Sequence, residues 1–344
     1  MQQEPVDEDH PRRGRGQTLE RVEERLLNPP GDDPGVILRL VGLGRTLLFD
    51  LGEHQLPTAE LLEVSDLFVS HAHIDHFAGF DRLLRALLGH DRRVRIHGGA
   101  GITRHVQGKL SGYLWNLDFA ALVEFEVREL SPAGRLHTTC FTLADRFQEP
   151  HPLPDRPAPE LLLDEAGFQV GWARVDHGVE CLAFWLAERD RFCFAADRLL
   201  AAGLAPGPHL AALKQRILSG REPMAESLGT WQRGRRIAYV TDCGFCPATV
   251  AGALRVAAGS DRLFCEATYP DREADKAARV HHLTGGQAGA LAAAARVAEL
   301  VPTHFSRRYR RNPGEILRDV DAGSLARSPW RETIREWIGE GESQ

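Results

Sequence analysis

The sequence predicts an α/β domain in which sheets are layered with helices. Short apolar segments typical of buried strands recur along the chain, and several are followed by amphipathic or Ala-rich segments typical of helices. This alternation favours a layered α/β class over an all-β barrel. The chain has 344 residues, 43% of them hydrophobic. That is enough for a folded core, and the length allows one large domain or two ordinary ones.

In the first part of the chain, residues 1–34 are polar and end in a Pro- and Gly-rich run, so we expect a flexible or short helical lead-in. Two strands joined by a Gly-rich turn should follow, at 36–40 and 46–50. Residues 67–70 are typical of a buried strand, and the apolar spacing from Phe77 to Leu88 predicts a helix.

The rest of the chain repeats this alternation. A strand-loop-helix unit should begin at 94–96, with short strands to about 146, and five prolines predict a Pro-rich insertion at about 148–160. Further strands are expected at 168–175, 181–186, 237–240, 263–265 and 300–304, with helical stretches at 196–234 and 287–298. The main domain should span 35–322, followed by a C-terminal helical tail at 323–344.

Composition limits where in the cell we expect the protein and which kinds of partner it could bind. No apolar run approaches the roughly 20 residues that cross a bilayer, and the first thirty residues lack the apolar core of a secretory signal. Six cysteines in a chain of this length favour reduced thiols, so we expect a cytoplasmic protein without a membrane partner. The formal net charge is −6, so any nucleic acid must bind to a local basic patch.

The densest functional signal is the run His71-x-His73-x-Asp75-His76, which directly follows the predicted strand 67–70. Imidazole and carboxylate ligands are those that Zn²⁺ and similar divalent ions prefer. A chance polar loop is the alternative, but this many ligands at a strand end make it improbable. The set is too rich for one ion with an open site, and two ions about 4 Å apart would use it better.

A two-metal site needs further ligands. His177, Asp242 and His304 are candidates because each follows a predicted strand, where α/β proteins usually place functional groups. Taken singly, each is as well explained as a surface or capping residue. Together with the dense motif, the metal interpretation is favoured.

The motif resembles the signature of metallo-β-lactamase fold hydrolases, and later segments resemble ribonuclease Z, the endonuclease that trims the 3′ ends of precursor tRNA. The resemblance covers about 36–312. The segments that carry it are Leu48–Glu53, His71–His76, Asp176–Glu180, Pro206–Pro208, Asp242, Cys265–Tyr269, His282 to Ala288 and Thr303–Tyr309.

The resemblance implies an αββα sandwich with two Zn²⁺ ions at its edge, with Mn²⁺ as the alternative metal. One ion would be bound by His71, His73 and His177, the other by Asp75, His76 and His304, and Asp242 would bridge them. A metal-activated hydroxide would then attack the phosphodiester of precursor tRNA. The resemblance also implies a homodimer.

Further roles follow from the same resemblance. Asp75 would orient the hydroxide, and His282, held by Glu266, would protonate the leaving oxygen. Ser306 and Arg308 would bind a phosphate. Without the resemblance, a solvated helix start explains His282 better than a catalytic role does, and a solvated cationic face explains Arg308 better than phosphate binding does. Arg307, Arg310 and Arg311 stay open as a local basic patch.

Departures from the family pattern keep two other functions open. The family's opening Gly-rich turn is replaced by Asn28–Pro34, and the substrate arm predicted at about 187–234 is short. A hydrolase of the same fold that acts on a small phosphodiester, ester or lactone is therefore the main alternative. A non-catalytic zinc-stabilised binding protein is the third, disfavoured because no proposed ligand or proton donor is missing.

Overall fold

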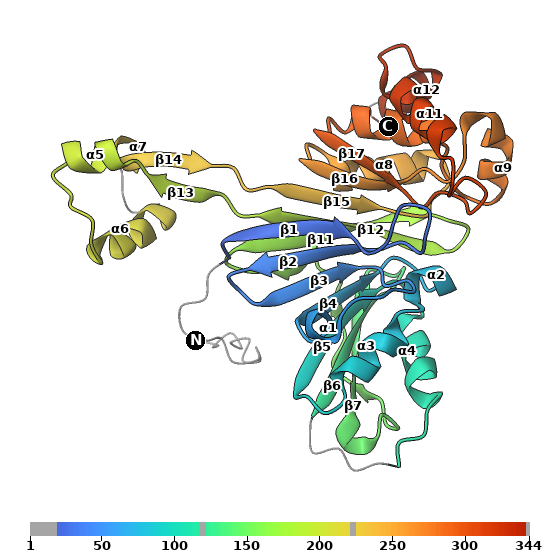
Figure 1. Cartoon of the computed structure of the whole chain (residues 1–344), viewed down its shortest axis with the longest axis horizontal. Helices are drawn as coiled ribbons and strands as arrows, with labels where there is room; N and C mark the ends of the chain where they lie inside the picture. The colour runs from blue at the N-terminus through green and yellow to red at the C-terminus, as the bar shows by residue number, and fades with distance from the viewer. Residues whose placement is uncertain (1–18, 117–121, 221–224, 342–344) are drawn as a thin grey trace.

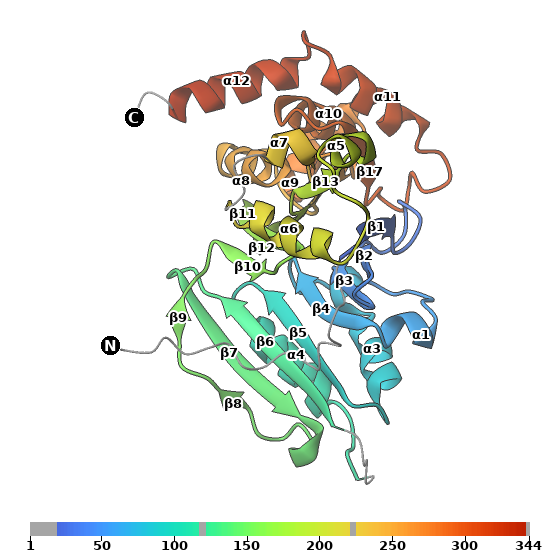
Figure 2. The same cartoon turned by 90° about the vertical axis from the view of Figure 1, so that its left-hand side faces the viewer.

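The computed structural model describes residues 19–116, 122–220 and 225–341. Two sheets lie face to face, and helices cover the outer face of each (Figure 1). Turning the molecule by 90° shows α10–α12 beyond one sheet and α3 and α4 against the other (Figure 2). The αββα sandwich expected from the sequence is confirmed.

The first sheet has nine strands in the order β1-β2-β3-β4-β5-β6-β7-β8, with β9 also paired to β7. Strands β3, β4, β5 and β6 run parallel to one another, whereas the pairs β1–β2, β2–β3 and β6–β7 are antiparallel. The strands are β1 (Arg21–Leu26), β2 (Val36–Val41), β3 (Arg45–Phe49), β4 (Val64–Val69), β5 (Arg92–Gly98), β6 (Val123–Leu130), β7 (Arg135–Thr142), β8 (His151–Pro152) and β9 (Arg156–Pro157). The helices on its outer face are α1 (Thr58–Leu61), α2 (Ile74–Phe77), α3 (Phe80–Leu87) and α4 (Ile102–Ser111).

The second sheet has six strands in the order β10-β11-β12-β15-β16-β17. Strands β15, β16 and β17 run parallel, so their carboxyl ends meet at one edge. The strands are β10 (Leu161–Asp164), β11 (Phe168–Asp176), β12 (Glu180–Glu188), β15 (Arg236–Val240), β16 (Arg262–Glu266) and β17 (Glu299–Thr303). The helices on its outer face are α8 (Pro247–Ala257), α9 (Ala274–Arg279), α10 (Gly285–Ala294), α11 (Gly314–Ser324) and α12 (Pro329–Gly341).

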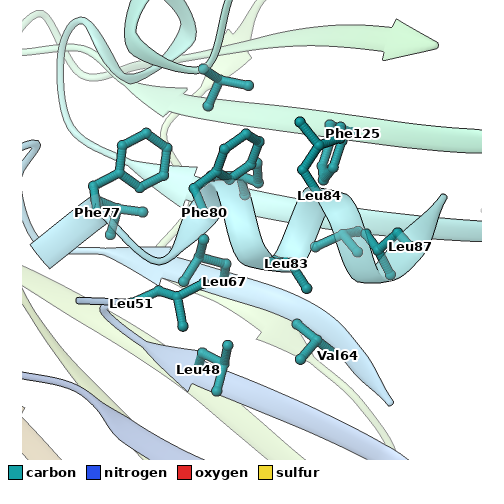
Figure 3. Close-up of a cluster of buried hydrophobic side chains, with 14 of the residues drawn as sticks. Leu48, Leu51, Val64, Leu67, Phe77, Phe80, Leu83, Leu84, Leu87 and Phe125 are labelled. Carbon is teal, nitrogen blue, oxygen red and sulfur yellow. The ribbon is translucent and has the colours of Figure 1, made fainter. Parts of the chain in front are cut away.

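Three buried apolar clusters hold the layers together. The cluster between the sheets includes Phe49, Phe68 and Phe184. A second joins the first sheet to its helices, and Figure 3 shows α3 presenting Phe80, Leu83, Leu84 and Leu87 to it. A third lies between the second sheet and α8, α10, α11 and α12. Alternate residues of the central strands therefore face different layers, which fixes their register.

The predicted arm region leaves the body of the molecule. Strands β13 (Arg191–Phe194) and β14 (Gly229–Gln232) form a separate two-stranded sheet. Helices α5 (Ala196–Ala201), α6 (His209–Leu218) and α7 (Ala225–Leu228) lie beyond it, around a small core of Phe192, Leu199, Ile217 and Leu228. Figure 1 shows this unit projecting from the end of the body opposite α2.

The expectation of a flexible or helical lead-in at 1–34 is wrong for its described part. Residues 21–26 form β1, which pairs with β2 over six residues. Its sequence was misleading because only Val22 is fully buried, while charged side chains point outward from this edge strand. Residues 1–18 lie outside the described part of the chain.

The predicted boundary between the main domain and a tail at 323 is also wrong, because it falls inside α11. Helices α11 and α12 belong to the core: Ile316 and Ile334 are buried in the cluster under α10. Glycines let α10 and α11 touch closely, since a Cβ on Gly289 would lie 2.1 Å from the Val320 carbonyl oxygen. The Pro-rich segment 148–160 is exposed and adds β8 and β9 beside β7.

Candidate active site

The metal-ligand motif begins where β4 ends. Strand β4 is buried and delivers His71 directly to the edge of the sheet. His73 is the N-cap of α2, and Asp75 and His76 lie within that short helix. The turn folds the four side chains toward the second sheet, where β11, β15 and β17 also end.

The structure brings all seven predicted ligands together. His71, His73, His177 and Asp242 form one group whose ligand atoms lie within 4.8 Å of one another. Asp75, His76 and His304 form a second such group. A third grouping joins Asp242, His282 and His304. The first two match the two ligand sets implied by the family resemblance.

Asp242 is the hub of this cluster. Its Oδ2 lies 3.8 Å from His71 Nε2, 3.5 Å from His177 Nε2 and 3.3 Å from His76 Nε2. Its Oδ1 lies 3.1 Å from His304 Nδ1. One carboxylate therefore touches both ligand groups, as a bridging ligand must.

Two buried nitrogens support the interpretation of the cluster as a metal site. Nε2 of His71 and Nε2 of His76 are buried and make no hydrogen bond within the described part of the chain. Leaving buried polar atoms unpaired is costly unless a ligand satisfies them. Burial, together with neighbouring His76, lowers the pKa of His71 to about 2, so its imidazole is neutral and can bind metal. The donor set fits a divalent ion.

A buried carboxylate orients His76. Asp50 Oδ2 accepts a hydrogen bond from His76 Nδ1 at 2.8 Å, which leaves Nε2 to face Asp242. Asp50 also accepts bonds from the Ser70 amide, the Ser70 hydroxyl and the Tyr239 hydroxyl at 2.7–2.8 Å. Its φ of 56° is uncommon for a residue with a side chain, so these four bonds hold a strained backbone in place.

His177 is oriented by a backbone carbonyl. Its Nδ1 donates to the carbonyl oxygen of His281 at 2.7 Å, so Nε2 faces Asp242. His281 has a φ of 54°, and the following residue is His282. One strained residue thus fixes a predicted ligand and directs the chain into the predicted proton donor.

His282 and Glu266 meet as the sequence predicted. His282 Nδ1 lies 3.0 Å from Glu266 Oε2, and its Nε2 lies 4.0 Å from Asp242 Oδ2. Glu266 is fully buried and also accepts bonds from the Cys243 amide and the Thr268 hydroxyl. Burial lowers the pKa of His282, but the Glu266 carboxylate more than offsets this and raises it to about 9. The imidazole can therefore carry a proton at neutral pH.

The predicted phosphate ligands are placed differently from each other. Ser306 lines a cavity of about 610 Å³ beside Asp75 and His304. Arg308 does not line it: its guanidinium lies 3.5 Å from Glu273 and is 64% exposed. Arg307 and Arg310, which the sequence left open, do line this cavity. No role was predicted for Asp50, Thr268 or the His281 carbonyl, although Asp50 and Thr268 lie in two of the segments that resemble the family, Leu48–Glu53 and Cys265–Tyr269.

Comparison with known proteins agrees with this geometry. No family model matches the chain. The chain is 36% identical over 297 residues to a ribonuclease Z of Deinococcus radiodurans, covering 82% of this chain and 89% of that protein. It is 30% identical over 313 residues to a ribonuclease Z of Crocosphaera subtropica, covering 87% and 88%.

Among solved structures, the short form of human tRNase Z shares the fold with a TM-score of 0.53 and 21% identity, over 83% of this chain and 93% of that one. A long-form RNase Z from yeast aligns with a TM-score of 0.51 and 13% identity, over 86% of this chain and 39% of that one. The identity and coverage of the curated relatives are decisive: the chain belongs to the ribonuclease Z family.

Proposed function

We propose that this protein is a zinc-dependent endoribonuclease that removes the 3′ trailer from precursor tRNA. The observation that carries the proposal is the pairing of two ligand groups around one carboxylate, Asp242, in a chain of this family. When bound, two zinc ions would acidify water and neutralise charge on the phosphoryl oxygens. Mn²⁺ suits the same carboxylate and imidazole ligands.

In this proposal the protein's own groups divide the remaining work. Asp75 lies 3.3 Å from His304 and lines the cavity where substrate would approach, so it can orient the attacking water. His282 holds a proton close to the ligand cluster, and Glu266 stabilises its charged form. Protonating the leaving oxygen in this way is worth about 10²–10⁴ in rate.

Substrate phosphates need cationic partners near the cluster. Ser306 borders the larger cavity, and the neighbouring Arg307 and Arg310 supply positive charge there. We retain Arg308 as a candidate because its side chain is exposed and its contact with Glu273 is a long, surface ion pair, which contributes little. Such local cations allow an acidic protein to hold RNA.

We further propose that the protein acts as a homodimer in which each arm serves the partner's site. The arm projects from the end of the body opposite α2, so it lies far from the cluster of its own chain (Figure 1). Helix α6 presents Lys214 and Arg216, which suit an RNA backbone. Light scattering would measure the mass, and a mixture of an arm-deleted chain with Asp242→Ala would recover activity only if arms work across subunits.

A cytoplasmic location is proposed because all six cysteines are free, as expected in a reducing compartment. None of the described helices has the length and apolar character needed to cross a membrane.

The function is tested with purified protein, a precursor tRNA bearing a 3′ trailer, and chelation followed by Zn²⁺ or Mn²⁺. We expect a single cut that releases the trailer, lost on chelation and restored by metal. Hydrolysis of a small aryl phosphodiester without tRNA cleavage would instead support the alternative small-molecule hydrolase.

A further inference from the structure

Two cavities border the ligand cluster and share no lining residue. The larger one adjoins Asp75 and His304. The smaller one, of about 270 Å³, adjoins His71 and His73. Each cavity thus borders a different ligand group. A phosphodiester held between the groups would have one ester arm toward each cavity.

The two cavities differ in chemistry. The larger one is lined by charged side chains of both signs, with Arg307 and Arg310 beside Asp32, Asp33 and Glu53, so its lining is polar and charged. The smaller one is walled by Val69, Ala100, Ile102 and Val179, and Ser70, His105 and Glu180 are its polar groups beside the predicted ligands His71 and His73. An apolar wall with a few polar groups is typical of a site for a small, flat ligand.

The smaller cavity is formed by two loops that face each other. Ala100 lies between β5 and α4, and Val179 lies in the turn between β11 and β12. The loops approach closely, because a Cβ on Gly99 would lie 3.4 Å from the Glu180 carboxyl group. Val179 is 48% exposed although it is apolar, so a bound ring would cover a side chain that water now contacts.

Glu180 is prepared to accept a hydrogen bond. Its Oε1 accepts a hydrogen bond from Arg174 Nε at 2.9 Å, which fixes the orientation of the carboxylate. Oε2 has no hydrogen-bond partner recorded in the described part of the chain. A carboxylate at the edge of a base pocket recognises bases that offer an amino group.

We propose that the smaller cavity holds the base of one of the two nucleotides flanking the cleaved bond, packed between Val179 and Ala100 with an amino group at Glu180. This rests on the proposed function, because only a nucleic-acid substrate brings a base to this place. The cavity then sets a nucleotide preference next to the cut, and Glu180 is the residue that sets it.

The test uses zinc-loaded full-length protein and precursor tRNAs carrying each of the four nucleotides immediately 5′ or 3′ of the cut. At one of these positions we expect adenine, cytosine or guanine to be preferred over uracil by about threefold to tenfold in kcat/KM, the effect of one hydrogen bond. Glu180→Gln should remove this preference, because an amide both donates and accepts. The position that responds identifies which nucleotide the cavity holds.

A second variant fills the cavity. Ala100 is exposed at its rim, so Ala100→Phe should fold normally and retain its zinc. We expect kcat/KM on precursor tRNA to fall at least about tenfold, as misplacing a substrate does. The loss should be much smaller for methyl p-nitrophenyl phosphate, whose methyl arm needs no pocket. Ala258→Phe, also exposed but lining neither cavity, is the matched control and should behave as wild type.

The outcomes separate the two proposals. The base pocket is overturned if the protein removes the trailer but shows no nucleotide preference, or shows one that Glu180→Gln does not abolish. It is also overturned if Ala100→Phe cleaves precursor tRNA as well as wild type does. In both cases the proposed function stands. A wild-type protein that hydrolyses methyl p-nitrophenyl phosphate but not precursor tRNA would overturn both.

Discussion

Strand β4 carries a cluster of buried charge at each end, and the two clusters differ in how their polar atoms are satisfied. Near its start, the buried Asp66 is bound by Arg95 at 2.6 Å, Arg45 at 3.1 Å, Ser65 at 2.7 Å and His97 at 3.2 Å. After its end, His71 and His76 have buried Nε2 atoms that make no hydrogen bond to any of the described residues and lie around a shared carboxylate.

The difference separates a structural cluster from a functional one. Both oxygens of Asp66 are paired by protein groups, so its charge is balanced without help from a ligand. In the Asp242 cluster several imidazoles converge on one carboxylate, and the Nε2 atoms of His71 and His76 face it, an arrangement that suits binding of a cation. His97 Nδ1, in the Asp66 cluster, is also buried without a hydrogen bond in the described part of the chain. An unpaired atom alone therefore does not separate the two clusters, whereas the convergence of several imidazoles on one carboxylate does.

The largest expected effect comes from removing the hub. Asp242→Ala should abolish trailer removal and lower the zinc content, because both ligand groups lose their shared carboxylate. Activity assays and elemental analysis measure the two effects. Asp275→Ala, which removes an exposed carboxylate on α9, is the control and should change neither. Full zinc content in Asp242→Ala would contradict its role as the bridge.

The next effect separates chemistry from metal binding within the same cluster. His282→Ala should slow cleavage of precursor tRNA by about 10²–10⁴ because the leaving oxygen loses its proton donor. Zinc content should stay at the wild-type level. A p-nitrophenyl ester needs no protonation of its leaving group, so its hydrolysis should fall far less.

A rival assignment for His282 exists, since Asp242, His282 and His304 also lie within ligand distance of one another. If His282→Ala loses as much zinc as Asp242→Ala, then His282 is a ligand and the proton donor must be sought elsewhere.

Removing the carboxylate at the start of β4 should lower the stability of the protein and leave its zinc content unchanged, the reverse of the effect expected at Asp242. Asp66→Asn leaves Arg45 and Arg95 without their buried partner, which should lower the free energy of unfolding by about 3 kcal/mol. This is the low end for a broken buried pair because both arginines are partly exposed. Zinc content should not change. Denaturant unfolding of the metal-free protein measures the loss.

The matched control for this variant is Glu23→Gln, which breaks an exposed pair with Arg21 and should cost less than about 1 kcal/mol. Loss of zinc in Asp66→Asn without loss of stability would show that the two clusters are not distinct.

Sequence reasoning found the ligands better than their supports. His71 to His76 are contiguous, and His177, Asp242 and His304 each follow a strand, so local patterns mark all seven. Asp50 accepts hydrogen bonds from both His76 and Tyr239, and Tyr239 lies 189 residues away in the sequence. No local pattern encodes a contact of that range.

The same limit explains the errors in the fold. The αββα layers follow from alternating patterns that are visible in the sequence. Strand β1 was missed because pairing with β2, rather than apolar burial, defines it. Arg308 lies in a family motif, yet its exposed side chain lies beside Glu273 and does not line the cavity next to the ligand cluster.

The smallest effect tests whether the Asp66 cluster is balanced by a neutral imidazole. His97 is fully buried, stacks on Phe68 and donates from Nε2 to Asp66. Burial lowers its pKa to about 4, against 6.5 in an unfolded chain. Below pH 6.5 the unfolded chain therefore binds a proton that the folded protein excludes, so stability falls as the pH decreases.

Between pH 7 and pH 5 this single group should lower the free energy of unfolding by about 2 kcal/mol. Metal-free wild type and His97→Gln are compared by urea unfolding at both pH values, because the glutamine amide can still donate to Asp66 but does not titrate. The variant should show a pH dependence that is flatter by this amount, whereas His90→Gln, at an exposed position, should match wild type. Equal pH dependence in wild type and His97→Gln would mean that the pKa of His97 is the same in the folded and the unfolded chain. A wild type that becomes more stable than the variant as the pH decreases would mean that His97 is charged in the fold.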